Sequence, residues 1–105
     1  MGEEGAPVWE VWNPDMEEAY GPSWNTWWCW YFMPEAWNRA RALGLRNPRV
    51  HHGELRYDGD SHTPVEVRLL LWGDTPAGMA WVMAHITVGH IMEYWADYTL
   101  SSERV

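Results

Sequence analysis

The sequence contains a single cysteine in 105 residues, so no disulfide can form within the chain. Cys29 lies between Trp28 and Trp30 in an apolar stretch, and no nearby base is present to activate its thiol. A cysteine in such a setting behaves as a small hydrophobic residue. We therefore expect Cys29 to be buried and do not place it in a site.

Basic residues are also few, with seven Lys and Arg against fifteen Asp and Glu, for a net charge of −8. Nucleic-acid binding draws most of its affinity from neutralised phosphates, and no basic stripe supplies it here. Charges at a helix end explain the four arginines between Arg39 and Arg49. The composition excludes nucleic acid as the expected partner.

Long apolar runs are absent, so no segment is expected to cross a membrane. Residues 1–5 are acidic and small, unlike the basic and apolar start of a signal peptide. We expect a soluble cytoplasmic protein whose residues 1–7 form a flexible extension.

The histidines lack the helical i, i+4 spacing of common zinc sites. His51 and His52 are adjacent, so in a strand their side chains point to opposite faces. A bulge at Gly53 would change which of the two faces a pocket, and this point stays open. We predict no metal site.

Tryptophan, by contrast, is abundant, with ten residues in this short chain. Each indole can bury a large area but brings an N–H group that needs a partner. Two interpretations stay open: a core rich in tryptophan, or rings that also line a pocket or an interface. The chain length suits one domain over residues 1–105.

The first half of the chain predicts a strand and helices. Residues 8–12 have strand character, and the Asn13-Pro14-Asp15 turn ends them. A helix is expected to start after Gly21-Pro22-Ser23, and one of its faces carries Trp24, Trp27, Trp28 and Tyr31. We expect this stripe to face the core, with an aromatic-lined cavity for a flat apolar ligand as the alternative.

Pro34 is expected to break or kink that helix, because proline lacks an N–H group and restricts the residue before it. A second helical segment is predicted over residues 34–43, ended by Gly44.

The second half predicts four strands at residues 49–57, 64–72, 79–88 and 91–99. Clusters of turn-forming residues separate them. The fold class is therefore α+β: a curved antiparallel sheet, made of a four-stranded meander and a short N-terminal strand, packed on helices rich in tryptophan.

Gly89-His90 matches a two-residue type II′ hairpin turn. Val88 would then lie opposite Ile91, and Asp97 opposite Val82. The face expected to meet the helices comprises Val82, Ala84, Ile86, Val88, Ile91, Glu93, Trp95 and Asp97. Apolar neighbours would raise the pKa of Asp97 by desolvation. The opposite face comprises Trp81, Met83, His85, Thr87, Met92, Tyr94, Ala96 and Tyr98, and its aromatic character predicts a dimer interface.

The stretch Gly-His-Ile-Met-Glu-Tyr-Trp-Ala-Asp-Tyr at residues 89–98 resembles the closing strand of SnoaL-like proteins. In that family a Gly-Lys-Ile turn precedes a Trp and an Asp at similar spacing, and the related limonene epoxide hydrolase ends with a Trp-x-Asp-Tyr run. Residues 11–14 and 19–21 resemble the family's early strand and its Tyr-Gly entry to a helix. The similarity covers residues 8–101 in outline.

The resemblance implies the cone-like fold of nuclear-transport-factor-like proteins, with a pocket inside the cone and a homodimer formed through the outer sheet face. The family includes polyketide cyclases, ketosteroid isomerase-like enzymes, epoxide hydrolases and non-catalytic domains. This chain departs from it in having seven residues before Val8, where family members usually carry helices.

By position, the resemblance implies that Asp97 is the general acid or base, that Asn13 orients a water molecule, and that Glu66 is a second acid. The expected neighbouring arginine is absent because Pro64 occupies its place, and Arg68 is a candidate substitute. The aromatic residues themselves, apart from the resemblance, give Trp12, Trp27, Trp28, Tyr31 and Trp95 as candidate walls of a ligand pocket.

These features predict a cofactor-independent acid/base enzyme of the isomerase, cyclase or epoxide hydrolase type, acting on a small apolar carbonyl or epoxide compound. The alternatives are a non-catalytic ligand-binding domain and a protein–protein interaction module that uses its acidic surface and exposed tryptophans.

Overall fold

The structure is a computed structural model that describes residues 8–90 and 93–102. The predicted flexible extension of residues 1–7 and the face assignments of Ile91 and Met92 lie outside the described residues. The elements are β1 (Trp9–Trp12), α1 (Pro14–Tyr20), α2 (Trp24–Ala42), β2 (Arg46–Tyr57), β3 (Pro64–Thr75), β4 (Gly78–Val88) and β5 (Tyr94–Ser102).

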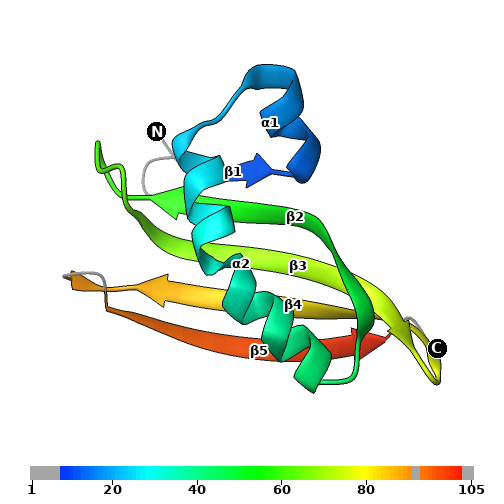
Figure 1. Cartoon of the computed structure of the whole chain (residues 1–105). Coiled ribbons are helices and arrows are strands. Elements are labelled where there is room, and N and C mark those ends of the chain that lie inside the picture. Colours follow the sequence, from blue (N-terminus) through cyan, green and yellow to red (C-terminus); the bar gives the residue numbers. More distant parts are fainter. Residues whose placement is uncertain (1–7, 91–92, 103–105) are drawn as a thin grey trace.

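The protein has an α+β fold, with one open antiparallel sheet of five strands in the order β1-β2-β3-β4-β5. Figure 1 shows α2 running diagonally across one face of this sheet, while α1 lies beyond β1. Alternation of buried and exposed residues along β3 and β4 leaves one face of the sheet toward α2 and one face uncovered. We call the uncovered side the outer face.

The core lies between α2 and the sheet. Val67, Leu69 and Leu71 of β3 are fully buried, as are Val82 and Ala84 of β4. The prediction that the apolar face of residues 82–88 meets the helices is therefore confirmed for β4. Neither described helix has the length and apolar character that a bilayer crossing requires.

Helix α1 begins where the sequence predicted a turn at Asn13-Pro14-Asp15 and continues to Tyr20, a helix that was not predicted from the sequence. Pro14 stands in its first turn, where a missing N–H group has no consequence. The Asn13 side chain accepts a hydrogen bond from the backbone N–H of Asp15 at 3.0 Å and so caps the helix. The Asn-Pro pair marks a helix start here rather than a simple turn.

Helix α2 continues through Pro34, so of the predicted break or kink the break does not occur, and the second segment predicted over residues 34–43 is the last part of the same helix. Proline removes the hydrogen bond to the carbonyl four residues earlier, at Trp30. Both residues are exposed, so water can reach this carbonyl. The Ser23 hydroxyl accepts from the Thr26 N–H at 3.2 Å and caps the start of the helix.

The predicted two-residue turn between β4 and β5 is also wrong. The Gly89 N–H donates to the Glu93 carbonyl at 2.6 Å, so the connection closes between these two residues and not between Val88 and Ile91. Val88 pairs with Tyr94, and His85, not Val82, lies opposite Asp97. The register differs from the prediction by three residues, and an odd shift moves every side chain of β5 to the other face.

Two contacts explain this register. The hydroxyls of Tyr94 and Tyr98 donate to the Glu35 carboxylate of α2 at 2.8 and 2.9 Å, so both tyrosines lie on the helix side. A Cβ atom at Gly89 would lie 2.8 Å from the Trp95 ring, so the indole packs where only glycine leaves room. Tyr94, Ala96 and Tyr98 thus leave the predicted aromatic outer face, and Trp95 and Asp97 join it.

Candidate functional site

Helix α2 presents a buried side and an exposed aromatic side. Its buried residues are Thr26, Trp28, Cys29, Phe32, Met33, Ala36 and Ala40. In the stripe predicted to face the core, only Trp28 is buried, whereas Trp24, Trp27 and Tyr31 are 55%, 52% and 47% exposed. The prediction that this stripe packs into the core is wrong for three of its four residues.

A close approach between α2 and β2 accounts for the difference. A Cβ atom at Gly53 would lie only 2.8 Å from the Cys29 sulfur, so the helix backbone comes near the strand at this point. Small side chains suit the points of closest approach, and Cys29, Ala36 and Ala40 are fully buried, while the larger Phe32 and Met33 are buried on the same side of the helix. The bulky indoles are therefore placed beside the contact or on its far side.

The exposed indoles form one wall of an open groove of about 770 Å³. We define this aromatic groove by its lining residues Glu17, Pro22, Ser23, Trp24, Thr26, Trp27, Trp30 and Tyr31. Figure 1 shows α1 and the first turns of α2 at the β1 end of the sheet, and residues of both helices line the groove. Helix α1 contributes Glu17, and the other residues belong to α2 and the connection before it.

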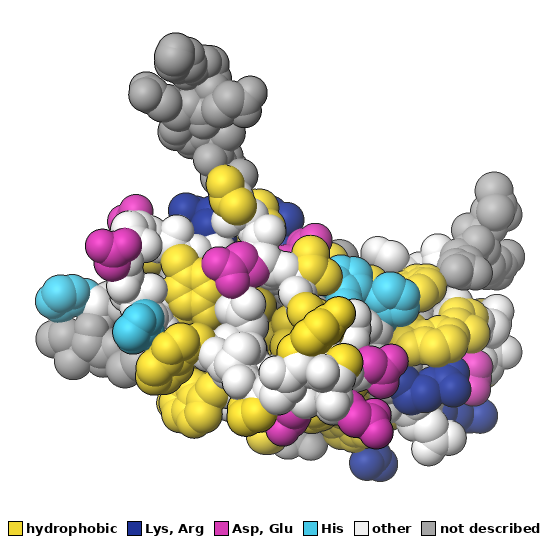
Figure 2. Space-filling model, turned by 90° about the horizontal axis from the view of Figure 1, so that it is seen from above, with side chains coloured by type: hydrophobic (Ala, Val, Ile, Leu, Met, Phe, Trp, Pro, Cys, Tyr) yellow, Lys and Arg dark blue, Asp and Glu magenta, His cyan; other side chains and the backbone are white. Residues whose placement is uncertain are grey.

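The rings of the aromatic groove are held by one another and by the core beneath. Trp27 and Tyr31, one turn apart, stack with ring centroids 5.2 Å apart. Trp30 meets buried Trp12 edge to face at 5.5 Å, and the Trp12 indole donates to the Thr26 hydroxyl at 3.2 Å. Seen from above, the molecule exposes hydrophobic side chains over much of one face, with acidic side chains among them (Figure 2).

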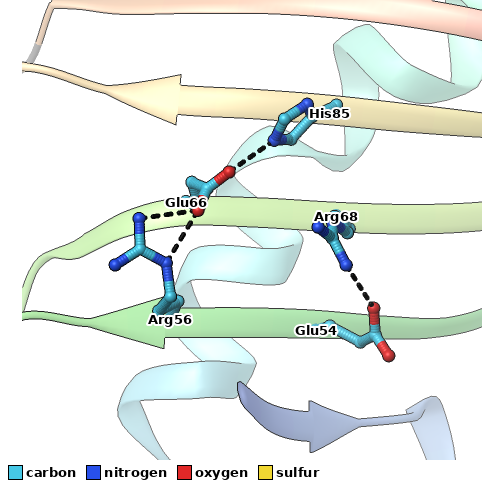
Figure 3. Close-up of polar contacts among 5 residues, drawn as sticks. All are labelled: Glu54, Arg56, Glu66, Arg68 and His85. Carbon is cyan, nitrogen blue, oxygen red and sulfur yellow. Dashed lines mark hydrogen bonds and ion pairs between the residues drawn. The ribbon is translucent and has the colours of Figure 1, made fainter. Parts of the chain in front are cut away.

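A second candidate region lies on the outer face of the sheet. Glu66 of β3 accepts hydrogen bonds from the Arg56 guanidinium of β2 through Oε1, with Nε at 2.7 Å and Nη2 at 2.6 Å. Its Oε2 lies 2.7 Å from Nε2 of His85 on β4 (Figure 3). The hydrogen bond with His85 lowers the pKa of Glu66 most, and Arg56 lowers it further, against the opposing effect of burial.

We call this row, completed by the pair Glu54 and Arg68, the polar ladder. Arg68 Nη1 lies 3.7 Å from Glu54 Oε1, and its guanidinium lies 4.0 Å from the centre of the Trp9 ring. Figure 3 shows all five side chains on the side of the sheet away from α2. The predicted neighbours Glu66 and Arg68 therefore share a face, but this face lies outside the core rather than in a pocket beneath the helix.

The other predicted site residues are spread over the molecule. Asp97 is exposed on the outer face opposite His85, so the apolar surroundings expected for it are absent. Asn13 caps α1. Trp95 is 60% exposed on the outer face, and Trp12 and Trp28 are buried. The structure thus brings Trp27 and Tyr31 together in the aromatic groove but does not join them to Asp97.

Sequence reasoning placed Trp24 on one helix face with Trp27 and Tyr31, but it missed Trp30 and Glu17 as neighbours in the groove and His85 as the partner of Glu66. Trp24, Trp27 and Trp30 recur every three residues, a signal for one helix side, whereas Glu17 is brought to them by helix α1, which was not predicted from the sequence. The pairing of His85 with Glu66 depends on the β3–β4 register, in which Arg68 lies opposite His85.

The histidine pair on β2 forms no metal site with a third ligand. His51 and His52 approach with their Nδ1 atoms 2.6 Å apart, next to a register shift between Val50 and His52 that turns both rings to one region. Desolvation first, and the neighbouring His51 second, lower the pKa of His52. Across the described part of the chain, no three His, Cys, Asp or Glu side chains are grouped to hold a metal ion.

Comparison of the chain with protein-family models, with curated proteins and with solved structures finds no match.

Proposed function

We propose that the protein binds a small apolar ligand in the aromatic groove. The observation that carries this proposal is the exposure of Trp24, Trp27 and Trp30 in a single hollow of about 770 Å³. Exposed aromatic rings are costly to leave in water, and contiguous apolar surface of this kind marks ligand and partner sites. The volume lies in the usual range for small-molecule pockets.

The groove also carries the few polar groups that orient a ligand. The Ser23 and Thr26 hydroxyls lie 3.2 Å apart at its floor, and the Glu17 carboxylate lies on the α1 side. Flat ring systems suit the walls because indole and phenol rings favour stacked and edge-to-face contacts. A compound with an apolar body and one polar or charged end therefore complements the groove.

Titration with the neutral dye N-phenyl-1-naphthylamine tests this proposal, since its emission rises in apolar sites. We expect saturable binding in the wild type and a loss of about tenfold or more in affinity in Trp27→Ala, because an aromatic wall is removed. Trp95→Ala is the matched control, since Trp95 is 60% exposed, against 52% for Trp27, but lies on the outer face. Equal loss in both variants, or no saturation in the wild type, would reject the aromatic groove as the site.

Acid/base catalysis on a small carbonyl or epoxide compound is a second candidate function. Its support is the polar ladder, in which the hydrogen-bonded Glu66 and His85 lie beside Asp97, the residue opposite His85. Paired carboxylate and imidazole groups can move a proton between a substrate and water. Turnover of an epoxide and ketone panel that disappears in Asp97→Asn and His85→Gln supports this function, and turnover that persists in both contradicts it.

Membership of the SnoaL-like superfamily, with a pocket inside a cone and a homodimer, stays a proposal. Its support is the order of elements, since a strand, helices and four antiparallel strands follow one another as in the family. A homodimer would use the outer face, where Trp72 and Trp81 stack at 5.7 Å. Light scattering of the purified protein tests the dimer, and a monomer at high concentration would contradict it.

A further inference from the structure

Acidic residues are unevenly distributed along this chain. Residues 1–38 contain seven acidic side chains and no Lys, Arg or His, whereas the rest of the chain contains eight acidic and seven basic residues. Every residue that lines the aromatic groove falls within the first 38. The groove is therefore built from the segment that carries almost all of the net charge of −8.

The acidic character extends to the groove itself. Glu17 is exposed and lines it, and Asp15 and Glu18 are exposed on the same short helix. Among residues 8–90 and 93–102, no arginine lines the groove. A negatively charged ligand would meet only like charge here, whereas a cation would meet a carboxylate and a negative potential.

The aromatic rings add to this preference, because the face of an indole or phenol ring attracts cations. On the outer face, arginines of the chain itself form such cation–π contacts. Arg68 lies 4.0 Å from the centre of the Trp9 ring, and Arg49 lies 4.1 Å from that of Trp72. In the groove, none of the described arginines lies over Trp24, Trp27 or Trp30. The ring of His62 stacks on Trp24 at 4.9 Å and that of Tyr31 on Trp27 at 5.2 Å, but both indoles stay about half exposed.

We infer that the ligand of the aromatic groove is an organic cation with a quaternary ammonium group. This inference rests on the proposed function, and it names the ligand class that the same site selects. A quaternary ammonium group has no N–H donors to satisfy and is weakly hydrated, so aromatic faces can replace its water shell. Glu17 supplies the opposite charge at the α1 side of the groove.

Choline and its neutral isostere 3,3-dimethylbutan-1-ol, in which carbon replaces the charged nitrogen, test this inference. Both are titrated at constant ionic strength into the ¹⁵N-labelled full chain, and the indole N–H signals of Trp24, Trp27 and Trp30 are followed by NMR. We expect choline to bind about three- to tenfold more tightly than the alcohol. In Glu17→Gln this ratio should fall toward one, while the control Glu18→Gln, an exposed neighbour that does not line the groove, should retain it.

The other outcomes separate the inference from the proposed function. Equal affinity for the two compounds overturns the inference and leaves the groove as a site for neutral ligands. Equal loss in Glu17→Gln and Glu18→Gln also overturns it, because the preference would then come from overall charge. If neither compound shifts the indole signals, the inference fails, and saturable dye binding that Trp27→Ala weakens still supports the proposed function.

Discussion

The two aromatic surfaces of this protein differ in what covers their rings. On the outer face, Arg68 lies over Trp9 and Arg49 over Trp72, and the charges of the polar ladder are paired across strands. In the aromatic groove, three tryptophans are about half exposed beside a lone carboxylate. On the outer face, Trp9 and Trp72 are covered by arginines of the chain, although Trp95 is 60% exposed there, whereas none of the described arginines lies over the rings of the groove.

The difference follows from how the two surfaces are built. Strands place side chains from neighbouring chain segments opposite one another, so an arginine on one strand readily meets a ring or carboxylate on the next. The groove instead lies between α1 and the first turns of α2, and its lining residues fall within residues 17–31, which contain no Lys, Arg or His. Exposed aromatic rings therefore indicate a binding site in this protein where no arginine of the chain itself lies over them.

We expect the largest loss of stability from a substitution at Gly53, where α2 contacts the sheet. Gly53→Ala places a Cβ atom 2.8 Å from the Cys29 sulfur and 3.0 Å from Leu69, so α2 must move away from β2. We expect the free energy of unfolding to fall by about 2 kcal/mol, measured by urea denaturation followed by circular dichroism. Dye binding in the groove should weaken, while the outer face keeps its contacts.

A double mutant identifies the cause of that loss. Cys29→Ala removes the sulfur atom that the new methyl group would meet, so Gly53→Ala should cost less in the Cys29→Ala background, by about 1 kcal/mol. Additive losses would show that the clash with Cys29 is not the reason.

The second loss of stability concerns the hydrogen bond between Trp12 and Thr26, which lies beneath the rings of the groove. Thr26→Val keeps the shape of the side chain but leaves the buried Trp12 indole N–H without its acceptor. An unsatisfied buried donor costs about 1–3 kcal/mol, and we expect urea denaturation to show a loss in this range. Thr87→Val, at an exposed position of β4, is the control and should change stability by less than about 0.5 kcal/mol. A comparable loss in the control would contradict the assigned role of the hydrogen bond.

These two sites also show how far sequence reasoning reaches. The α+β class and the buried face of β4 follow from alternation of apolar residues, because a strand repeats every two residues. The exposure of Trp24, Trp27 and Tyr31 did not follow, since a helix with large residues on several sides has no single apolar face to identify. The close contact of Gly53 with Cys29 fixes which side of α2 meets the sheet, and such a contact is a tertiary property.

The placement of Asp97 shows the same limit in the sheet. The Gly89-His90 pair is compatible with a two-residue turn, but the backbone closes between Gly89 and Glu93. The hydrogen bonds of Tyr94 and Tyr98 to Glu35, 59 and 63 residues away in sequence, support the register observed. Because the predicted loop was too short, the prediction assigned Asp97 and Trp95 to the wrong face of the sheet. The predicted site was therefore placed on the wrong face as well.

The third prediction is a pH-dependent change in the free energy of unfolding, and it arises from Glu66 in the polar ladder. The pKa of Glu66 is lowered in the folded protein, so its contribution to stability is present above the ordinary value of 4.5 and is lost as the pH falls through the folded value. At neutral pH, Glu66→Gln should lose about 1 kcal/mol in the free energy of unfolding. The difference from wild type should shrink as the pH is lowered below about 4.5.

Urea denaturation at a series of pH values measures this difference. Glu18→Gln, at an exposed position of α1, controls for the removal of one negative charge. A difference between wild type and Glu66→Gln that grows toward acid pH would reverse the assigned sign. Dye binding in the groove should be unaffected by Glu66→Gln, because the polar ladder lies on the other side of the sheet.

We expect the smallest loss of stability from removing an arginine of the outer face. This substitution tests whether these arginines cover the aromatic rings in solution. Arg49→Ala removes the guanidinium that lies 4.1 Å from the centre of the Trp72 ring and should lower the free energy of unfolding by about 0.5–1 kcal/mol. Arg49→Lys keeps a positive charge but loses the planar contact, so its loss should be smaller. If the comparison of the two surfaces is correct, Arg49→Ala also gives Trp72 an exposed face that choline can contact weakly, visible as a new shift of its indole N–H signal. No such shift, together with unchanged stability, would mean that Arg49 does not cover Trp72 in solution, and the contrast between a satisfied outer face and an open groove would then fail.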